Sequence, residues 1–173
     1  MNATPFVTDA SLGRLARRLR QLGYDVLVHR GARLEELLEA AARDGRTVLT
    51  RSARHPKRWA AVPALHLESG ELAEQLREVT SRAAPSSPPL GRCSHCNHVL
   101  RARSTFEAHG EVPGRVARGG SPLWNCTGCG QWFWLGTHTE RLRAYFTGIL
   151  GPVAGWPTRP EPPAPGQMAR SLP

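Results

Sequence analysis

The sequence predicts an α/β fold, in which a parallel sheet flanked by helices precedes a small domain that four cysteines hold together. Short β-like runs alternate with helical patterns over residues 1–82, as is typical of parallel sheets covered by helices. A Pro/Ser linker, residues 83–91, separates this domain from residues 92–147, which contain all four cysteines and a final helical segment. We expect the proline-rich residues 148–173 to form a disordered tail.

The first half of the α/β domain predicts a strand, a helix and a second strand. Residues 5–8 are short and apolar, as in a buried strand. The next segment places apolar side chains on one helical face: Leu12, Leu15, Ala16, Leu19 and Leu22. Gly23 is a typical helix end, and residues 24–28 form the second predicted strand.

The second half of the domain continues the alternation. A second amphipathic helix carries Leu34, Leu37, Leu38 and Ala41 and closes at Asp44-Gly45, and a last helix carries Leu72, Leu76 and Val79. Residues 47–50 and 64–67 are the third and fourth predicted strands. The pattern therefore predicts a parallel sheet covered on both faces, where ligands bind beyond the carboxyl ends of the strands.

The cysteines form two C-x2-C pairs, Cys93/Cys96 and Cys126/Cys129, each in a short polar turn. Two residues between cysteines allow both sulfurs to bind one ion, and two such turns supply four thiolates for tetrahedral coordination. We therefore predict a structural zinc site. Two disulfides, a redox C-x-x-C and unrelated thiols are the alternatives. Disulfides would suit a secreted chain, but the first residues show no secretory signal, so we expect a cytoplasmic protein.

Basic residues dominate the charge of the chain. Its net charge is +9, and all but one of its 23 basic residues are arginines, Lys57 being the exception. Such a surface favours polyanions, because basic side chains that neutralise phosphates release counterions and arginine binds phosphate through two parallel bonds. The alternative is that the arginines only reflect the composition of the genome. No apolar run approaches the roughly 18 residues that a membrane span needs, which excludes a membrane protein.

Polar residues follow the carboxyl ends of the predicted parallel strands, the side of the sheet where ligands bind, which we call the carboxyl edge. Asp9 ends the first strand, and Thr50-Arg51-Ser52 ends the third. A carboxylate in this position is a candidate ligand for a hard divalent ion such as Mg²⁺. The alternative is that Asp9 caps the helix that starts near Ser11. Asp25 and Glu35 are the other acids that we place near this edge.

A basic run follows the third strand and contains Arg51, Arg54, His55, Lys57 and Arg58, with Trp59 at its end. These residues can hold a phosphate backbone while Trp59 stacks on a base, or they form a solvated loop with Trp59 on the core. The helix after Asp9 can extend this patch through Arg14, Arg17 and Arg18. A cluster of aromatic residues in the cysteine region either packs around the metal or stacks on nucleobases: Trp124, Trp132, Phe133 and Trp134.

Four segments together resemble the PIN-like RNase domain of the mut-seven C-terminal family: FVTDASLGRLARRLRQLGYDVLV, LEELLEAAARDGRTVLTR, RCSHCNHVL and CTGCGQWFWLGTH. The resemblance covers roughly residues 5–147 and implies a PIN-type nuclease fold followed by a zinc ribbon. It implies carboxylates that hold Mg²⁺ or Mn²⁺, which would activate water for attack on an RNA phosphodiester. Asp9 matches the first acid of the family, and Asp25 matches its Gly-Tyr-Asp motif. His138 lies in the motif that ends the resemblance and is a candidate phosphate ligand.

The chain departs from the family at two acidic positions. Ser52 stands where the family has an aspartate, and Leu34 stands where it tends to have another, so that Glu35 is the nearest carboxylate. Each lost carboxylate weakens a site that concentrates cations. Two hypotheses follow: a metal-dependent ribonuclease that uses Asp9, Asp25 and Glu35, or a catalytically degenerate PIN-like RNA-binding module with structural zinc.

Overall fold

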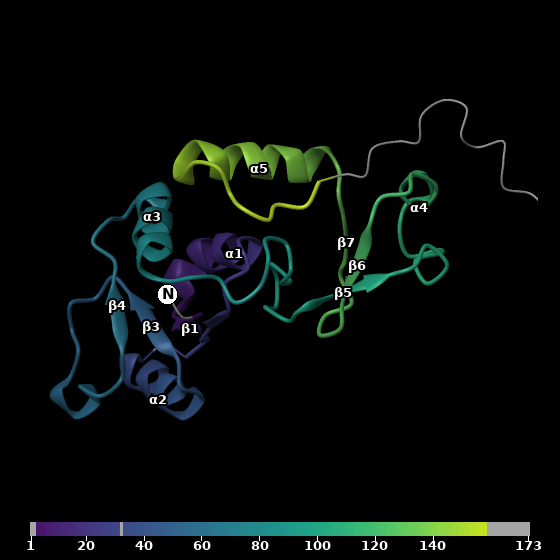
Figure 1. The fold of residues 1–173 in the computed structure, drawn as a ribbon. Helices are drawn as coiled ribbons and strands as arrows, with labels where there is room; N and C mark the ends of the chain where they lie inside the picture. Colours follow the sequence, from purple (N-terminus) through teal and green to yellow (C-terminus); the bar gives the residue numbers. More distant parts are fainter. Residues whose placement is uncertain (1–2, 32, 159–173) are drawn as a thin grey trace, which may run out of the picture.

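The computed structural model describes residues 3–31 and 33–158, which form a four-stranded sheet with helices and a three-stranded ribbon beside it (Figure 1). The larger sheet contains β1 (Phe6–Thr8), β2 (Val26–Val28), β3 (Thr47–Thr50) and β4 (Ala64–His66), all parallel, in the order β2-β1-β3-β4. The prediction of a parallel sheet in the N-terminal part of the chain is therefore confirmed.

Helices cover both faces of this sheet, as predicted. On one face lie α1 (Gly13–Gln21) and α3 (Leu72–Arg82), with α5 (Thr137–Leu150) above them, and on the other lies α2 (Leu34–Asp44) (Figure 1). Successive side chains of a strand point to opposite faces. Phe6 accordingly joins the core under α1 and α3, whereas Val7 joins the core over α2. A short 3-10 turn, η1 (Ala10–Leu12), leads from β1 into α1.

The ribbon is an antiparallel sheet of β5 (Leu100–Arg103), β6 (Leu123–Cys126) and β7 (Trp132–Trp134). The excursion between β5 and β6 contains the short helix α4 (Gly114–Arg118) and packs on one face of this sheet through Ala108, Val112 and Leu123. The small size of this core is consistent with a domain that depends on a metal for stability.

The predicted disordered tail is wrong for residues 148–158. Helix α5 continues to Leu150, and the chain then returns so that Trp156 packs on Phe146, with their ring centroids 5.9 Å apart. Trp156 is buried in the same core as α1 and α3 because its large apolar ring gains more from burial than the preceding proline and glycines lose. The rest of the predicted tail, residues 159–173, lies outside the described residues.

The linker, residues 83–91, lies along the end of α1. The amides of Ser86 and Ser87 donate to the carbonyl of Gly23, each at 3.1 Å. A Cβ at Gly23, whose φ is +92°, would come within 2.0 Å of the Ser87 carbonyl oxygen, so only glycine allows this approach. Within the described residues, no helix is long and apolar enough to cross a membrane.

Candidate functional site

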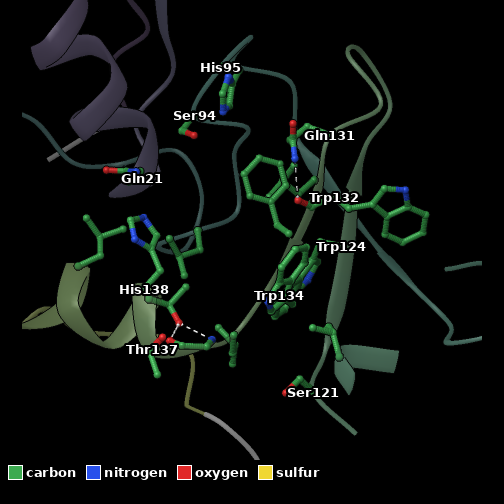
Figure 2. A pocket seen from close by; sticks show the side chains of 18 of the residues that line it. Gln21, Ser94, His95, Ser121, Trp124, Gln131, Trp132, Trp134, Thr137 and His138 are labelled. Carbon is green, nitrogen blue, oxygen red and sulfur yellow. Dashed lines mark hydrogen bonds between the residues drawn. The ribbon is translucent and has the colours of Figure 1, made fainter. Parts of the chain in front are cut away.

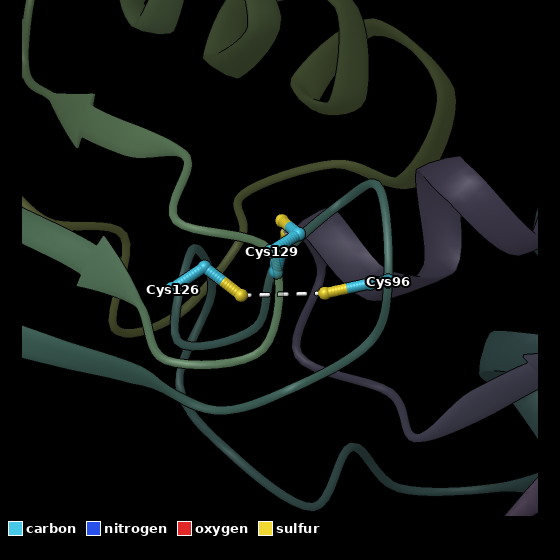
Figure 3. A group of neighbouring side chains, drawn as sticks. Cys96, Cys126 and Cys129 are labelled. Carbon is cyan, nitrogen blue, oxygen red and sulfur yellow. Dashed lines mark hydrogen bonds between the residues drawn. The ribbon is translucent and has the colours of Figure 1, made fainter.

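The sulfurs of the four cysteines form one cluster, and Figure 3 shows Cys96, Cys126 and Cys129 of this cluster. The sulfurs of Cys93 and Cys129 are 3.6 Å apart, those of Cys96 and Cys126 are 3.3 Å apart, and all four lie within 4.8 Å of one another. A tetrahedral zinc ion with bonds of about 2.3 Å separates its sulfurs by about 3.8 Å. Disulfide sulfurs would be about 2.05 Å apart, and all four thiols are free. The cluster is therefore at metal-binding distance and fits a zinc ribbon.

The two cysteine turns have the same backbone geometry. The amide of Asn97 donates to the Cys93 carbonyl at 2.9 Å, and the amide of Gly130 donates to the Cys126 carbonyl at 2.8 Å. Asn97 and Gly130, each directly after the second cysteine, have φ values of +74° and +72°. Glycine adopts this conformation freely and asparagine tolerates it. Burial raises the pKa of Cys126, but the Cys129 amide and the Cys96 thiol outweigh it and lower that pKa to about 7.

Arg20 and Asn97 attach the first cysteine turn to the α/β domain. The buried Arg20 guanidinium donates to the carbonyls of Val26 at 2.8 Å and His95 at 2.9 Å. The Asn97 side chain accepts the Val26 amide at 3.1 Å and donates to the Asp25 carboxylate at 2.8 Å. The turn is therefore held against the beginning of β2 by bonds between residues that are more than 70 positions apart.

Asp25 lies at the opposite edge of the sheet from Asp9, so the expectation that both acids share one edge is wrong. Asp25 directly precedes β2, whereas Asp9 directly follows β1. The two strands are parallel and in register, with Phe6–Thr8 beside Val26–Val28. The two carboxylates are therefore separated by the length of a strand, and Asp25 cannot join a site at the carboxyl edge.

Basic side chains surround Asp25. Arg46 donates to its carboxylate at 2.7 Å, and Arg92 is 3.4 Å away, with both guanidinium groups largely buried. Burial would raise the pKa of Asp25, but the hydrogen bonds from Arg46 and Asn97 and the two positive charges outweigh it and hold this pKa below its usual value. Asp25 therefore holds the two domains together as an ionised carboxylate.

The lowered pKa of Asp25 predicts a pH dependence of stability. A carboxyl group with a lower pKa in the folded state stabilises the fold above its unfolded pKa of about 3.9, and this stabilisation is lost as the pH falls through the folded value. We expect Asp25→Asn to lower the free energy of unfolding by about 1.5–3 kcal/mol at neutral pH, and the difference from wild type to shrink below about pH 4. Urea unfolding across this pH range measures it.

The control for this prediction is Asp44→Asn, because the Asp44 carboxylate pairs with Arg43 on the surface. Exposed pairs contribute little, so this variant should follow the wild type at every pH. A constant difference between Asp25→Asn and wild type down to acidic pH would contradict the role of the ionised Asp25 carboxylate.

The carboxyl edge of the sheet is formed by the residues that follow the four strands. Across the sheet these are His29 after β2, Asp9 after β1, Arg51 and Ser52 after β3, and Glu68 near the end of β4. The Oδ1 atom of Asp9 accepts the Ser11 amide at 2.7 Å and also the Ser11 hydroxyl, so Asp9 caps η1, which is the alternative considered from the sequence. Its Oδ2 atom has no bond to any described residue.

Ser52, at this edge, forms its hydrogen bonds within its own loop. Its hydroxyl oxygen accepts the Arg54 amide at 3.2 Å, and its own amide donates to the Thr50 hydroxyl at 3.0 Å. Glu35, in the first turn of α2, lies 3.8 Å from Arg58 across an exposed ion pair. Of these two residues, Ser52 is neutral and the Glu35 carboxylate is paired with a cation.

The three acids predicted to hold a catalytic divalent cation do not lie together at the carboxyl edge. Among the described residues, the cysteine cluster is the one group of three or more His, Cys, Asp or Glu side chains close enough to hold an ion. Hard cations such as Mg²⁺ need several oxygen ligands at about 2.0–2.1 Å, and Asp9, Asp25 and Glu35 are not brought together. The predicted set of three catalytic acids is therefore not assembled.

His29 is a residue of this edge that the sequence reasoning missed. Its Nε2 atom is buried and has no hydrogen-bond partner among the described residues, and a Cβ at Gly31 would come within 2.4 Å of this atom and within 2.2 Å of the Glu36 carboxylate. The signal was available: His29 directly follows the second predicted strand, and the rule that selected Asp9 also selects it.

The basic residues predicted to bind nucleic acid fall into two groups. Five are exposed and form no ion pair within the described residues: Arg14, Arg17, Arg51, Arg54 and Lys57. Two have intramolecular partners. Arg18 lies over the Tyr145 ring, 4.9 Å from its centroid, and Arg58 lies over the Trp59 ring and near Glu35.

Trp59 packs against the core over α2, with Val7, Leu38 and Val62 among the buried residues there. This agrees with the alternative in which Trp59 belongs to the core, and it leaves the surface of the basic run without a free aromatic ring. The basic run is therefore a cationic loop around η2 (Lys57–Trp59), which connects the end of β3 to the beginning of β4.

A groove of about 630 Å³ separates the ribbon from the start of α5 (Figure 2). Its lining includes the four aromatic residues singled out from the sequence, which lie on β6 and β7, and His138, which lies in the first turn of α5. The sequence reasoning did not find its other polar lining residues, among them Gln21, Ser94 and Arg115. These residues come from three separate segments, and no spacing pattern connects them.

Comparison with family models matches residues 4–146 to a model described as Mut7-C RNAse domain. This range spans both the α/β domain and the ribbon and includes Asp9, all four cysteines and His138. Comparisons with curated proteins and with solved structures give no match.

Proposed function

Because the chain belongs to the Mut7-C RNAse domain family, we propose that it binds single-stranded RNA along the carboxyl edge of its parallel sheet as a catalytically degenerate module. The observation that carries the proposal is how the two central strands end. β1 ends in one carboxylate, Asp9, whereas β3 ends in Arg51 and Ser52. This edge therefore offers phosphate ligands in place of a set of cation ligands.

The unpaired cations around this edge provide the binding energy. Arg51, Arg54 and Lys57 lie in the loop that follows β3. Arg14 and Arg17 lie on α1, the helix that follows Asp9. A side chain that neutralises a phosphate of a single strand releases counterions and contributes about 0.7 to the slope of log K against log salt concentration. Several such contacts bind RNA with little dependence on its sequence.

A structural zinc ion on Cys93, Cys96, Cys126 and Cys129 is part of the proposal. Four protein ligands leave no open coordination position, so the ion would stabilise the ribbon and take no part in a reaction. Four thiols at metal-binding distance suit a reducing compartment, and this supports the cytoplasm as the location.

A metal-dependent ribonuclease is the second candidate, and the position of Asp9 favours it. Asp9 ends a central strand, at the edge where α/β sheets bind ligands, and its Oδ2 atom has no bond to a described residue. The requirement for further carboxylates counts against this candidate, because Ser52 is neutral and Glu35 is paired with Arg58.

One set of measurements on fluorescently labelled single-stranded RNA distinguishes the two candidates. For a binding module, wild-type protein binds the RNA with an affinity that falls with salt and leaves it intact in Mn²⁺. Asp9→Asn should bind at least as tightly, since it removes a negative charge near the phosphates, whereas Lys57→Ala should lower the salt slope by about 0.7.

Metal-dependent cleavage by the wild-type protein that Asp9→Asn abolishes would establish the ribonuclease instead. Ser52→Asp is the complementary variant, because it adds a carboxylate at the end of β3. Cleavage by Ser52→Asp with an inert wild type would show that the site lost activity through this position. Absence of RNA binding by the wild-type protein at low salt would refute the proposal.

A further inference from the structure

The groove between the ribbon and α5 is separate from the carboxyl edge of the sheet. Its walls come from β6 and β7, the first cysteine turn, the exposed side of α1 and the start of α5 (Figure 2). Its volume, about 630 Å³, lies in the range of about 300–1,000 Å³ that is typical of ligand sites.

Two aromatic residues of the groove are not needed for the core of the ribbon. Trp124 on β6 is paired in register with Phe133 on β7, so both side chains lie on the same face of the ribbon. Leu123, Trp132 and Trp134 lie on the other face, where they pack with Ala108 and Val112. Trp124 and Phe133 remain half-exposed and belong to none of the described hydrophobic clusters.

The charge of the groove is positive. Arg17, Arg92 and Arg115 line it, together with His95 and His138, and none of its lining residues is acidic. Arg92 is engaged with Asp25, whereas Arg17 and Arg115 are exposed and form no ion pair within the described residues.

Helix α5 adds a weaker attraction for anions at the same place. Gly136, at its N-cap, has no side chain to bond the first amides of the helix. A helix of this length favours a negative group near its N-terminus. His138 and Thr137 lie in this first turn and line the groove (Figure 2).

We propose that this groove binds unpaired nucleotides of single-stranded RNA, with a base stacked on Trp124 or Phe133 and its phosphates at Arg17 and Arg115. Exposed aromatic rings beside cations are the typical binding surface for single strands, because every base has a face to stack. Bases inside a duplex are not available for such stacking. The inference rests on the proposed RNA-binding function and adds the segment that would hold the bases.

Helix α1 connects the groove to the carboxyl edge. Arg14 and Arg17 are three positions apart, so they lie on the same helical face, and both are exposed. Arg14 is in the first turn after η1, close to the end of β1, whereas Arg17 lines the groove. One RNA strand can therefore contact the basic loop, α1 and the groove in succession.

The test measures binding of a labelled oligouridylate of about ten nucleotides to the zinc-loaded full-length protein by fluorescence anisotropy. Trp124→Ala should weaken binding by about 5-fold to 150-fold, the range for loss of one stacked base, without changing the salt slope. Arg115→Ala should lower the salt slope by about 0.7. Trp124→Phe should retain most of the affinity because it preserves a stacking face.

Phe106→Ala is the matched control, since Phe106 is 89% exposed in the same domain and does not line the groove. It should bind as the wild type does. Zinc content and circular dichroism identify a Trp124→Ala protein that has failed to fold, in which case Trp124→Lys and Phe133→Ala replace it in the same assay.

The outcomes separate this inference from the proposed function. If the wild type does not bind the oligouridylate, the RNA-binding function itself fails. If the wild type binds, Lys57→Ala lowers the salt slope and folded Trp124 and Phe133 variants bind normally, only the groove inference is overturned. Displacement of the oligouridylate by a synthetic peptide of residues 159–173 would overturn it in favour of the chain's own tail as the occupant.

Discussion

Cys126→Ser is expected to abolish stoichiometric zinc binding and to unfold the ribbon. The Cys126 sulfur is one of four within 4.8 Å of one another, and its removal leaves three thiolates for an ion that structural sites bind with four. Structural zinc contributes an apparent 10–16 kcal/mol in small domains, about as much as the whole stability of a typical domain. The buried core of the ribbon is too small to compensate for this loss.

Metal content and tryptophan fluorescence measure this loss directly. Wild type should carry one zinc ion per chain, and a chelator should produce the same spectrum as Cys126→Ser. Three of the five tryptophans, Trp124, Trp132 and Trp134, lie in the ribbon and report its unfolding. Thr127→Ser, an exposed position in the same turn, is the control and should match the wild type. A ribbon that keeps its fluorescence and melting temperature after chelation would contradict a structural zinc ion.

Arg20→Ala is expected to lower the free energy of unfolding by about 3–5 kcal/mol, because it leaves several carbonyl groups around the buried side chain without a donor. The guanidinium donates to the carbonyls of Val26, Ser94 and His95. Each carbonyl that remains buried without a donor costs about 1–3 kcal/mol. A zinc ion with four thiolates also has a net negative charge, and Arg20 is the buried cation next to Cys93 and Cys96.

Urea unfolding of the zinc-loaded protein measures the effect of Arg20. Arg14→Ala is the matched control, because Arg14 is on the same helix but exposed, and its loss should change stability by less than about 0.5 kcal/mol. Arg20→Lys should lie between wild type and Arg20→Ala, since one ammonium group cannot reproduce the planar fork of arginine. Equal midpoints for Arg20→Ala and Arg14→Ala would show that the bonds of Arg20 do not hold the domains together.

The elements of the α/β domain could be predicted because each follows a local pattern. The strand at 47–50 and the helix that begins at Leu34 agree with the structure, because apolar periodicity and a glycine at the helix end determine them within their own segments. Asp9 could be placed at the carboxyl edge for the same reason, because it directly follows a strand.

Asp25 was misplaced although the sequence contained the signal. The second strand was predicted at residues 24–28, and a residue near the beginning of a parallel strand lies at the edge opposite to residues that follow the other strands. Its role could not be predicted, because its partners Arg46, Arg92 and Asn97 are distant along the chain. The tail was mispredicted for a related reason: Trp156 is one apolar residue without periodicity, and only the Phe146 surface makes its burial favourable.

By itself, the sequence determined the order of the strands and helices and the four cysteines of the metal cluster. These depend on residue type and on spacing along a few turns or strands. The tertiary structure alone decided where the ribbon attaches, which arginines stay unpaired and that Trp124 and Phe133 border a groove. Those features are contacts between segments many residues apart, and such contacts form only once the packing of both domains brings their side chains together.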